Sequence, residues 1–315
     1  MGGEGPQRGA GRLSPLDDLV HPPEPWPHEG IAGWWARATP FARELSPADS
    51  ALRLGAHADR VAYAFAAGYL GALSALVPDR DRTKVAALCA TEAGGVHPRA
   101  VEATFDGARV TGEKSFVTFA VEAEELLVLA KEGEIDGRPA LALVRVAASD
   151  EGVSVSTLPE TPFVPEIGHG AVRLDGARGE RLDGDGWADY VRPFRTVEDL
   201  HVHLAFMGWL IASACRWGAP EATVEAGLAQ AMALRALCGE DPGAPSTHVA
   251  LAGAIDAASG LVEGFDWSVA PPEDRARFER DRALLRVASK ARARRRERAW
   301  ERVRASDEAP RSPGT

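Results

Sequence analysis

Residues 91–118 constrain the fold more than any other part of the sequence, because they contain its strongest hairpin signal. A run that alternates like a strand ends at Phe105, the turn residues Asp106-Gly107 follow, and a second extended run begins near Val110. Two short extended runs joined by Asp-Gly are typical of a β-hairpin, since this dipeptide accepts the backbone of a tight turn. The segment therefore predicts an antiparallel strand pair.

The pattern of short strands extends beyond this hairpin, from residue 84 to residue 195. Gly, Pro and Asp turns separate the runs, and a tight corner is expected at Gly112-Glu113-Lys114. Short strands with regular turn signals indicate an antiparallel β-sandwich or barrel. The predicted strands are residues 85–89, 100–105, 109–110, 116–118, 126–130, 140–146, 153–158 and 171–174.

Helical periodicity flanks this β region on both sides. Ser46 followed by Pro47 is typical of a helix start, and apolar residues at helical spacing continue until Pro78 stops the pattern. After residue 195, helical segments with short joints indicate an up-down four-helix bundle. The predicted helices of this bundle are residues 197–217, 222–237, 247–263 and 273–304.

The two ends of the chain differ from the rest in composition. Residues 1–45 are rich in Gly, Pro and charge, so we expect a flexible or draped arm that tryptophans such as Trp26 can pin to the body. Residues 306–315 are expected to be a disordered tail. The sequence thus predicts an α+β, multi-domain fold. A short N-terminal helical part (46–83), a β domain (84–195) and a C-terminal helical bundle (196–305) follow one another.

Composition limits the classes of function. The 315 residues carry a formal net charge of -10, which argues against nucleic acid or an anionic membrane surface as a partner. Three cysteines without CxxC spacing fit a reducing cytosol better than disulfides or zinc. The most apolar run, residues 202–215, is shorter than a bilayer span, and no signal peptide is recognisable. These features predict a cytoplasmic protein without a membrane span.

Several short motifs occur in a fixed order along the β region. The run that begins Thr91-Glu92 leads to the Asp-Gly turn and then to Gly112-Glu113-Lys114. Leu-Leu-Val-Leu-Ala at 126–130, His-Gly-Ala-Val-Arg-Leu-Asp-Gly at 169–176 and Leu-Asp-Gly-Asp-Gly-Trp at 182–187 come after it. This order resembles that of the acyl-CoA dehydrogenase family over about residues 50–265. The chain is identified as a divergent, N-terminally abbreviated member, which implies FAD as cofactor and a homo-oligomeric assembly.

The resemblance assigns two segments to the flavin. The first segment lies along the ring, and the second supplies a large side chain for one ring face and a Thr hydroxyl for the N5 edge. The alternative is that both threonines are ordinary strand hydroxyls on the surface. The cofactor-binding residues implied in this way are Leu88, Ala90, Thr91, Phe116, Val117 and Thr118.

The loop expected to meet the substrate matches the family less closely. Val96 and His97 stand where family members carry the Gly and Ser that contact the thioester. The resemblance therefore assigns substrate binding to these two residues, and it supports a flavin more strongly than it supports an acyl-CoA ligand.

A catalytic carboxylate is implied at Glu198. The common C-terminal glutamate motif of the family is absent, but a minority of members place the base ten residues before a Gly on the first helix of the last domain. Glu198 precedes Gly208 by that spacing, and an apolar pocket would raise its pKa toward neutrality. In the alternative interpretation, Thr196 caps this helix, Asp199 completes a capping box, and the acidic residues only complement the helix N-terminus.

Two further features have alternative interpretations. His201, His203 and His248 have no metal-ligand spacing with a carboxylate, so we expect core or surface histidines and no metal site. The basic last predicted helix is either a solvated amphipathic helix or one that faces an anion, such as FAD pyrophosphate, or a neighbouring subunit.

The implied reaction is α,β-dehydrogenation of an acyl-CoA or other small-molecule thioester by an FAD-dependent oxidoreductase. Two alternatives remain open at this point. One is a non-catalytic scaffold or partner subunit of the same fold, and the other is a flavin-dependent monooxygenase.

Overall fold

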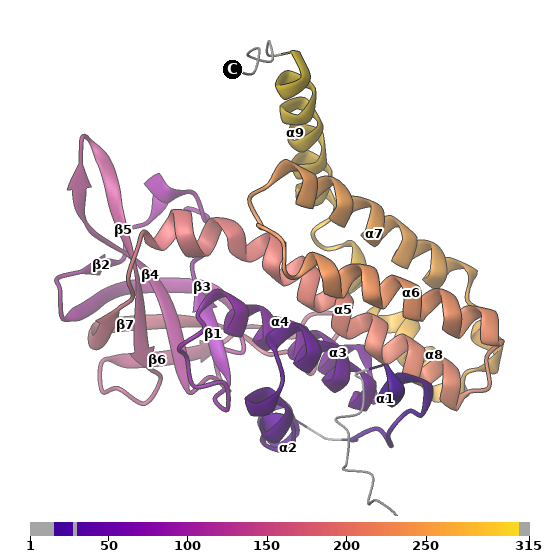
Figure 1. Cartoon of the computed structure of the whole chain (residues 1–315). Coiled ribbons are helices and arrows are strands. Elements are labelled where there is room, and N and C mark those ends of the chain that lie inside the picture. Colours follow the sequence, from indigo (N-terminus) through magenta and orange to yellow (C-terminus); the bar gives the residue numbers. More distant parts are fainter. Residues whose placement is uncertain (1–15, 28–29, 309–315) are drawn as a thin grey trace, which may run out of the picture.

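The computed structural model describes residues 16–27 and 30–308. Along the chain, helices come first, strands follow, and helices form the last part (Figure 1). Residues 1–15 of the predicted arm and residues 309–315 of the predicted tail lie outside the described residues.

The N-terminal region contains more helix than predicted. Helices α1 (Asp17–Val20) and α2 (Ile31–Glu44) occupy much of the expected arm. Trp34 and Trp35 of α2 are buried, and Trp34 stacks on Tyr63. The flexible arm was therefore a wrong interpretation for residues 31–44, because these tryptophans bury enough apolar surface to hold a helix against the body. Helices α3 (Pro47–His57) and α4 (Val61–Leu76) follow, as predicted.

The strands form a closed barrel. It is not purely antiparallel, although that had been predicted, because two of its strand pairs are parallel. Strand β4 (Glu125–Ile135) pairs with β5 (Arg138–Ala147) on one edge and with β1 (Ala86–Cys89) and then β2 (Thr104–Phe105) on the other. The ring closes through β3 (Arg109–Thr118) and β7 (His169–Arg181), and β6 (Val153–Thr157) adds to β7. The β1–β4 and β2–β4 pairs are parallel. Parallel neighbours need a long connection, and here the chain passes through β3 before it reaches β4.

The predicted hairpin is present as β2 and β3. Phe105 pairs with Val110, and the Asp106 carboxylate accepts hydrogen bonds from the N–H groups of Ala108 and Arg109. The expected corner at residues 112–114 is absent. Gly112 instead sits in a bulge within β3, with φ of +149°, where a Cβ atom would lie 2.6 Å from Cα of Ala103.

The helices of the two chain ends share one core. Helix α5 (Arg192–Arg216) packs against α3 and α4 as well as against α6 (Glu221–Leu237). Gly208 of α5 permits this, since a Cβ atom there would lie 2.1 Å from the Leu52 carbonyl oxygen. The N-terminal helical part and the C-terminal helices are therefore packed as one helical layer beside the barrel.

The last predicted helix is interrupted. Helix α7 (Pro245–Gly264) is followed by α8 (Pro272–Asp281), a 3-10 turn (Arg282–Arg286) and α9 (Ser289–Glu308). Helix α9 packs along α7 and extends away from the body (Figure 1). It includes residues 306–308, which had been predicted as tail. In the part of the chain that the structure describes, every helix is too short or too polar to cross a lipid bilayer.

Candidate functional site

A cavity of about 360 Å³ lies between the barrel and the helical layer. The end of β1, the strained part of β3 and one stripe of α5 line it, and the segment between α8 and α9 covers it. Seven of the nine residues implied by the family resemblance meet at this cavity. They are Leu88, Ala90, Thr91, Val96, Phe116, Thr118 and Glu198.

The other two implied residues lie elsewhere. The Val117 side chain is buried in the barrel core. His97 is exposed, and its Nδ1 atom accepts a hydrogen bond from the N–H of Arg99, at the start of a single 3-10 turn. These positions do not support direct contact of either side chain with a ligand in the cavity.

Glu198 lies on the cavity-facing stripe of α5. Burial, and after it the nearby charge of Asp199, raises the pKa of its carboxyl to about 7. Among the described residues, no hydrogen bond or ion pair reaches this carboxylate. It is therefore placed to exchange a proton near neutral pH with a molecule in the cavity.

The capping alternative for this helix is wrong. Six residues of π-helix (Gly186–Val191) precede α5, so Thr196 is already inside the helix and is buried. Asp199 does not form a capping box. Its carboxylate makes a 3.2 Å ion pair with Arg292 and a second, short one with Arg295, both from α9. The two neighbouring carboxylates thus have different environments, because Asp199 is paired with two arginines whereas Glu198 is unpaired.

Phe116 is held in an unusual backbone conformation on the barrel side. Its φ is +54°, at a register shift of β3 between Lys114 and Val117. A left-handed aromatic residue is strained, and such strain is concentrated at functional sites. The bulge directs the Phe116 ring away from the barrel core. The residue is 64% exposed, and its ring lies close to the ring of His169. An exposed aromatic face is thereby presented to the cavity.

Two hydroxyls on the barrel side are free to bind a ligand. Thr91 and Thr118 are half-buried at the cavity wall, and neither hydroxyl has a hydrogen-bond partner in the described part of the chain. A half-buried hydroxyl that no protein group satisfies is a suitable donor or acceptor for a polar ligand edge. Together with Phe116, these hydroxyls fit a flat heteroaromatic ring with polar edges, as in a flavin.

A buried ion pair fixes the loop between Thr91 and β3. The Glu92 carboxylate accepts hydrogen bonds from Lys114 Nζ and from the N–H groups of Glu102 and Ala103. Lys114 is 1% exposed. In the sequence, Glu92 and Lys114 stand out only as parts of the family motif. A lysine among the inward positions of a strand, downstream of a glutamate at a turn, was the available signal for a buried pair.

Tyr69 of α4 is a second site residue that sequence reasoning missed. The Leu88 N–H donates a 3.0 Å hydrogen bond to the Tyr69 hydroxyl, which lies at the cavity wall near Glu198. Burial raises the pKa of this phenol, so it remains protonated. Because its oxygen accepts from Leu88, its own proton remains available to the cavity.

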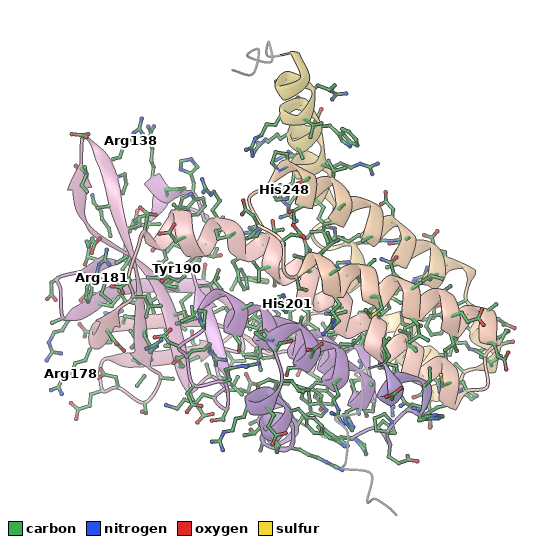
Figure 2. The ribbon with its side chains drawn as sticks, in the orientation of Figure 1. Arg138, Arg178, Arg181, Tyr190, His201 and His248 are labelled. Atoms are coloured by element: carbon green, nitrogen blue, oxygen red, sulfur yellow. The ribbon has the colours of Figure 1, made fainter. Side chains whose placement is uncertain are left out.

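Both histidines of α5 are buried, and His203 also lines the cavity. Nδ1 of His201 lies 2.8 Å from the Val197 carbonyl, and Nδ1 of His203 lies 2.7 Å from that of Asp199. Both side chains are buried in the helical layer, and Figure 2 labels the first. Within the described ranges, no group of three His, Cys, Asp or Glu side chains is arranged to hold a metal ion.

The comparisons with known proteins concern the fold. No protein-family model and no curated protein matches the sequence. Among solved structures, the FAD complex of PigA matches with a TM-score of 0.62 and 13% identity, over 91% of this chain and 92% of PigA. Butyryl-CoA dehydrogenase from Megasphaera elsdenii matches with a TM-score of 0.57 and 17% identity, over 80% and 81%.

A third similar structure is the prolyl acyl carrier protein oxidase AnaB. Its TM-score is 0.57 at 13% identity, over 82% of this chain and 86% of AnaB. At these identities the similarity is one of fold, and it extends over most of each chain. The chain therefore has the fold of the acyl-CoA dehydrogenase family.

Proposed function

We propose that this protein is an FAD-dependent oxidoreductase that removes two hydrogens across the α,β-bond of a thioester, with Glu198 as the base. One observation supports this most strongly. An unpaired carboxylate whose pKa is raised to about 7 shares a cavity with an exposed Phe116 ring and two unsatisfied threonine hydroxyls.

The barrel side would hold the flavin. Phe116 would cover one ring face, while the hydroxyls of Thr91 and Thr118 would bind polar ring edges. The Glu92–Lys114 ion pair keeps the loop after Thr91 in place. When bound, the flavin supplies the hydride acceptor of the reaction.

The helical side would handle the proton. Above its pKa, Glu198 is a carboxylate that accepts the proton from the carbon alpha to the thioester carbonyl. Below that pKa it is already protonated and cannot act as a base. The neighbouring Asp199 cannot replace it, because Arg292 and Arg295 hold its carboxylate. Tyr69 can donate a hydrogen bond into the same space.

The similar structures support a thioester substrate. One is named as a dehydrogenase of butyryl-CoA and another as an oxidase of a prolyl acyl carrier protein. Both names describe acyl groups on a pantetheine sulfur, so we infer a thioester substrate for this chain and leave its acyl group unassigned. We also expect a homo-oligomer.

The test is anaerobic bleaching of the FAD-loaded protein by a saturated thioester, with butyryl-CoA and a butyryl carrier protein as probes. We expect bleaching by at least one probe, and a loss of about 10²-fold or more in rate for Glu198→Gln with unchanged FAD content. Glu225→Gln is the matched control, because Glu225 is an exposed glutamate on α6.

Other outcomes would favour the alternatives. A folded protein that cannot be loaded with FAD would favour a non-catalytic scaffold. A yellow protein that ignores both thioesters, yet consumes oxygen when its flavin is reduced, would favour a monooxygenase. Full bleaching rates in Glu198→Gln would show that another residue is the base.

A further inference from the structure

A second and larger hollow lies along the outside of the helical layer, between α7 and α9. This groove has a volume of about 870 Å³. One stripe of α7, from His248 to Ser259, forms one wall, and α9 forms the other (Figure 2 labels His248). The basic residues that line it are His248, Arg286, Arg292, Arg295, Arg296 and Arg304.

The charge of α9 is opposite to that of the protein as a whole. The helix carries eight Lys and Arg residues against four Asp and Glu, whereas the chain has a net charge of -10. Some of this positive charge is used internally, because Asp199 and Asp256 pair with arginines of α9. In the described part of the chain, Arg304 has no ion-pair partner, and Trp300 beside it is 40% exposed.

The groove and the candidate active-site cavity share a boundary. Leu285 and Arg292 line both of them. Arg292 also contacts Asp199, the neighbour of Glu198. From Arg292 to Arg304 the helix rises about 18 Å, at 1.5 Å per residue. A ligand anchored by its phosphate at the distal half of α9 can therefore extend a linear arm back toward the cavity.

Positive charge also covers the side of α9 that faces away from the groove. Lys290, Arg294 and Arg298 are exposed, do not line the groove, and have no ion-pair partner among the described residues. A single nucleotide in the groove would leave these residues unused. A partner protein with an acidic surface could cover both sides of a helix about 30 Å long.

We propose that α9 and the α7–α9 groove dock an acidic carrier protein, which delivers its phosphopantetheine-bound thioester to the cavity. The groove receives the phosphate, and the arm passes the boundary formed by Leu285 and Arg292. The negative body of the protein directs an acidic partner to this helix, because α9 is the surface that attracts it. The choice of a thioester carrier rests on the proposed function, whereas the docking surface can be tested separately.

The experiment measures binding without turnover, with the full-length FAD-loaded protein and an acidic holo-acyl carrier protein labelled away from its phosphopantetheine. The test variant is Arg294→Glu/Arg298→Glu, at two exposed positions of α9 that do not line the groove. The matched control is Arg138→Glu/Arg178→Glu, with the same charge change on the barrel at the other end of the molecule (Figure 2). Fluorescence anisotropy is recorded at low and at high salt.

We expect the wild type to bind the carrier protein saturably and more weakly at high salt. The α9 variant should bind the carrier at least about tenfold more weakly, whereas the affinity of the control should change within about twofold. FAD content and affinity for butyryl-CoA should be equal in all three proteins. The proposal is overturned if the wild type does not bind the carrier, if both variants bind alike, or if the α9 variant loses butyryl-CoA or FAD to the same extent. Tighter binding of a DNA duplex, lost in the same variant, would overturn it as well. Flavin bleaching is measured independently, so failure of docking leaves the proposed dehydrogenation to be judged on its own.

Discussion

The two walls of the cavity differ in how the sequence determines them. The barrel wall is built by local signals, namely a turn, a bulge and an ion pair within residues 91–118. The α9 side is held by contacts between residues more than ninety positions apart, such as Asp199 with Arg292. The comparison shows that local chemistry fixes the proposed flavin side, whereas long-range charge pairing positions the segment that covers the cavity.

The largest effect is expected from breaking the barrel wall with Lys114→Met. The change leaves the buried Glu92 carboxylate without its cation, so we expect a loss of about 3 kcal/mol in the free energy of unfolding, measured with urea. The double change Glu92→Gln/Lys114→Met should restore much of this loss. An unaltered unfolding midpoint in Lys114→Met would mean that the pair does not hold the loop.

A smaller effect is expected on the opposite wall from Asp199→Asn. Arg292 and Arg295 lose their carboxylate, which should cost about 2 kcal/mol and increase amide exchange at the start of α9. Because the charge of Asp199 raises the pKa of Glu198, the variant should also shift the pH dependence of flavin reduction toward lower pH. A shift toward higher pH would contradict this electrostatic assignment.

The smallest effect is expected from Thr118→Val, which removes one hydroxyl from the barrel wall without changing its shape. If that hydroxyl binds the flavin, FAD affinity should fall by about fivefold, which corresponds to about 1 kcal/mol. Thr104→Val is a suitable control, because Thr104 is an exposed strand threonine away from the cavity. Equal FAD affinity in both variants would remove Thr118 from the site.

The elements that could be predicted from the sequence are those that short-range preferences determine. The Asp106-Gly107 turn and the helical segments on both sides of the barrel follow from short-range preferences. The features that could not be predicted are those that depend on contacts between residues far apart in the sequence. The parallel pairing of β1 with β4 depends on a strand more than thirty residues away. Asp199 resembled a capping residue near an expected helix start, but its partners are arginines of α9.

The site was predicted in the same uneven way. The family motif led to Thr91, Phe116 and Thr118, but the left-handed backbone that exposes Phe116 comes from a register shift that alternation cannot reveal. Tyr69 looked like one of many apolar helix residues, since its hydroxyl finds Leu88 only when α4 packs against the barrel. The sequence gives no signal for the interruption before α9, because residues 273–304 contain neither proline nor glycine.

The most direct test of the central claim is the pH dependence of anaerobic flavin reduction by a thioester. Burial raises the pKa of Glu198, so the active carboxylate form disappears as pH falls through about 7. We predict a rate that rises with pH, with a midpoint near 7, and a strongly reduced rate in Glu198→Gln that lacks this transition. A flat profile in the wild type, or the same midpoint in Glu198→Gln, would contradict the assignment of Glu198 as the base.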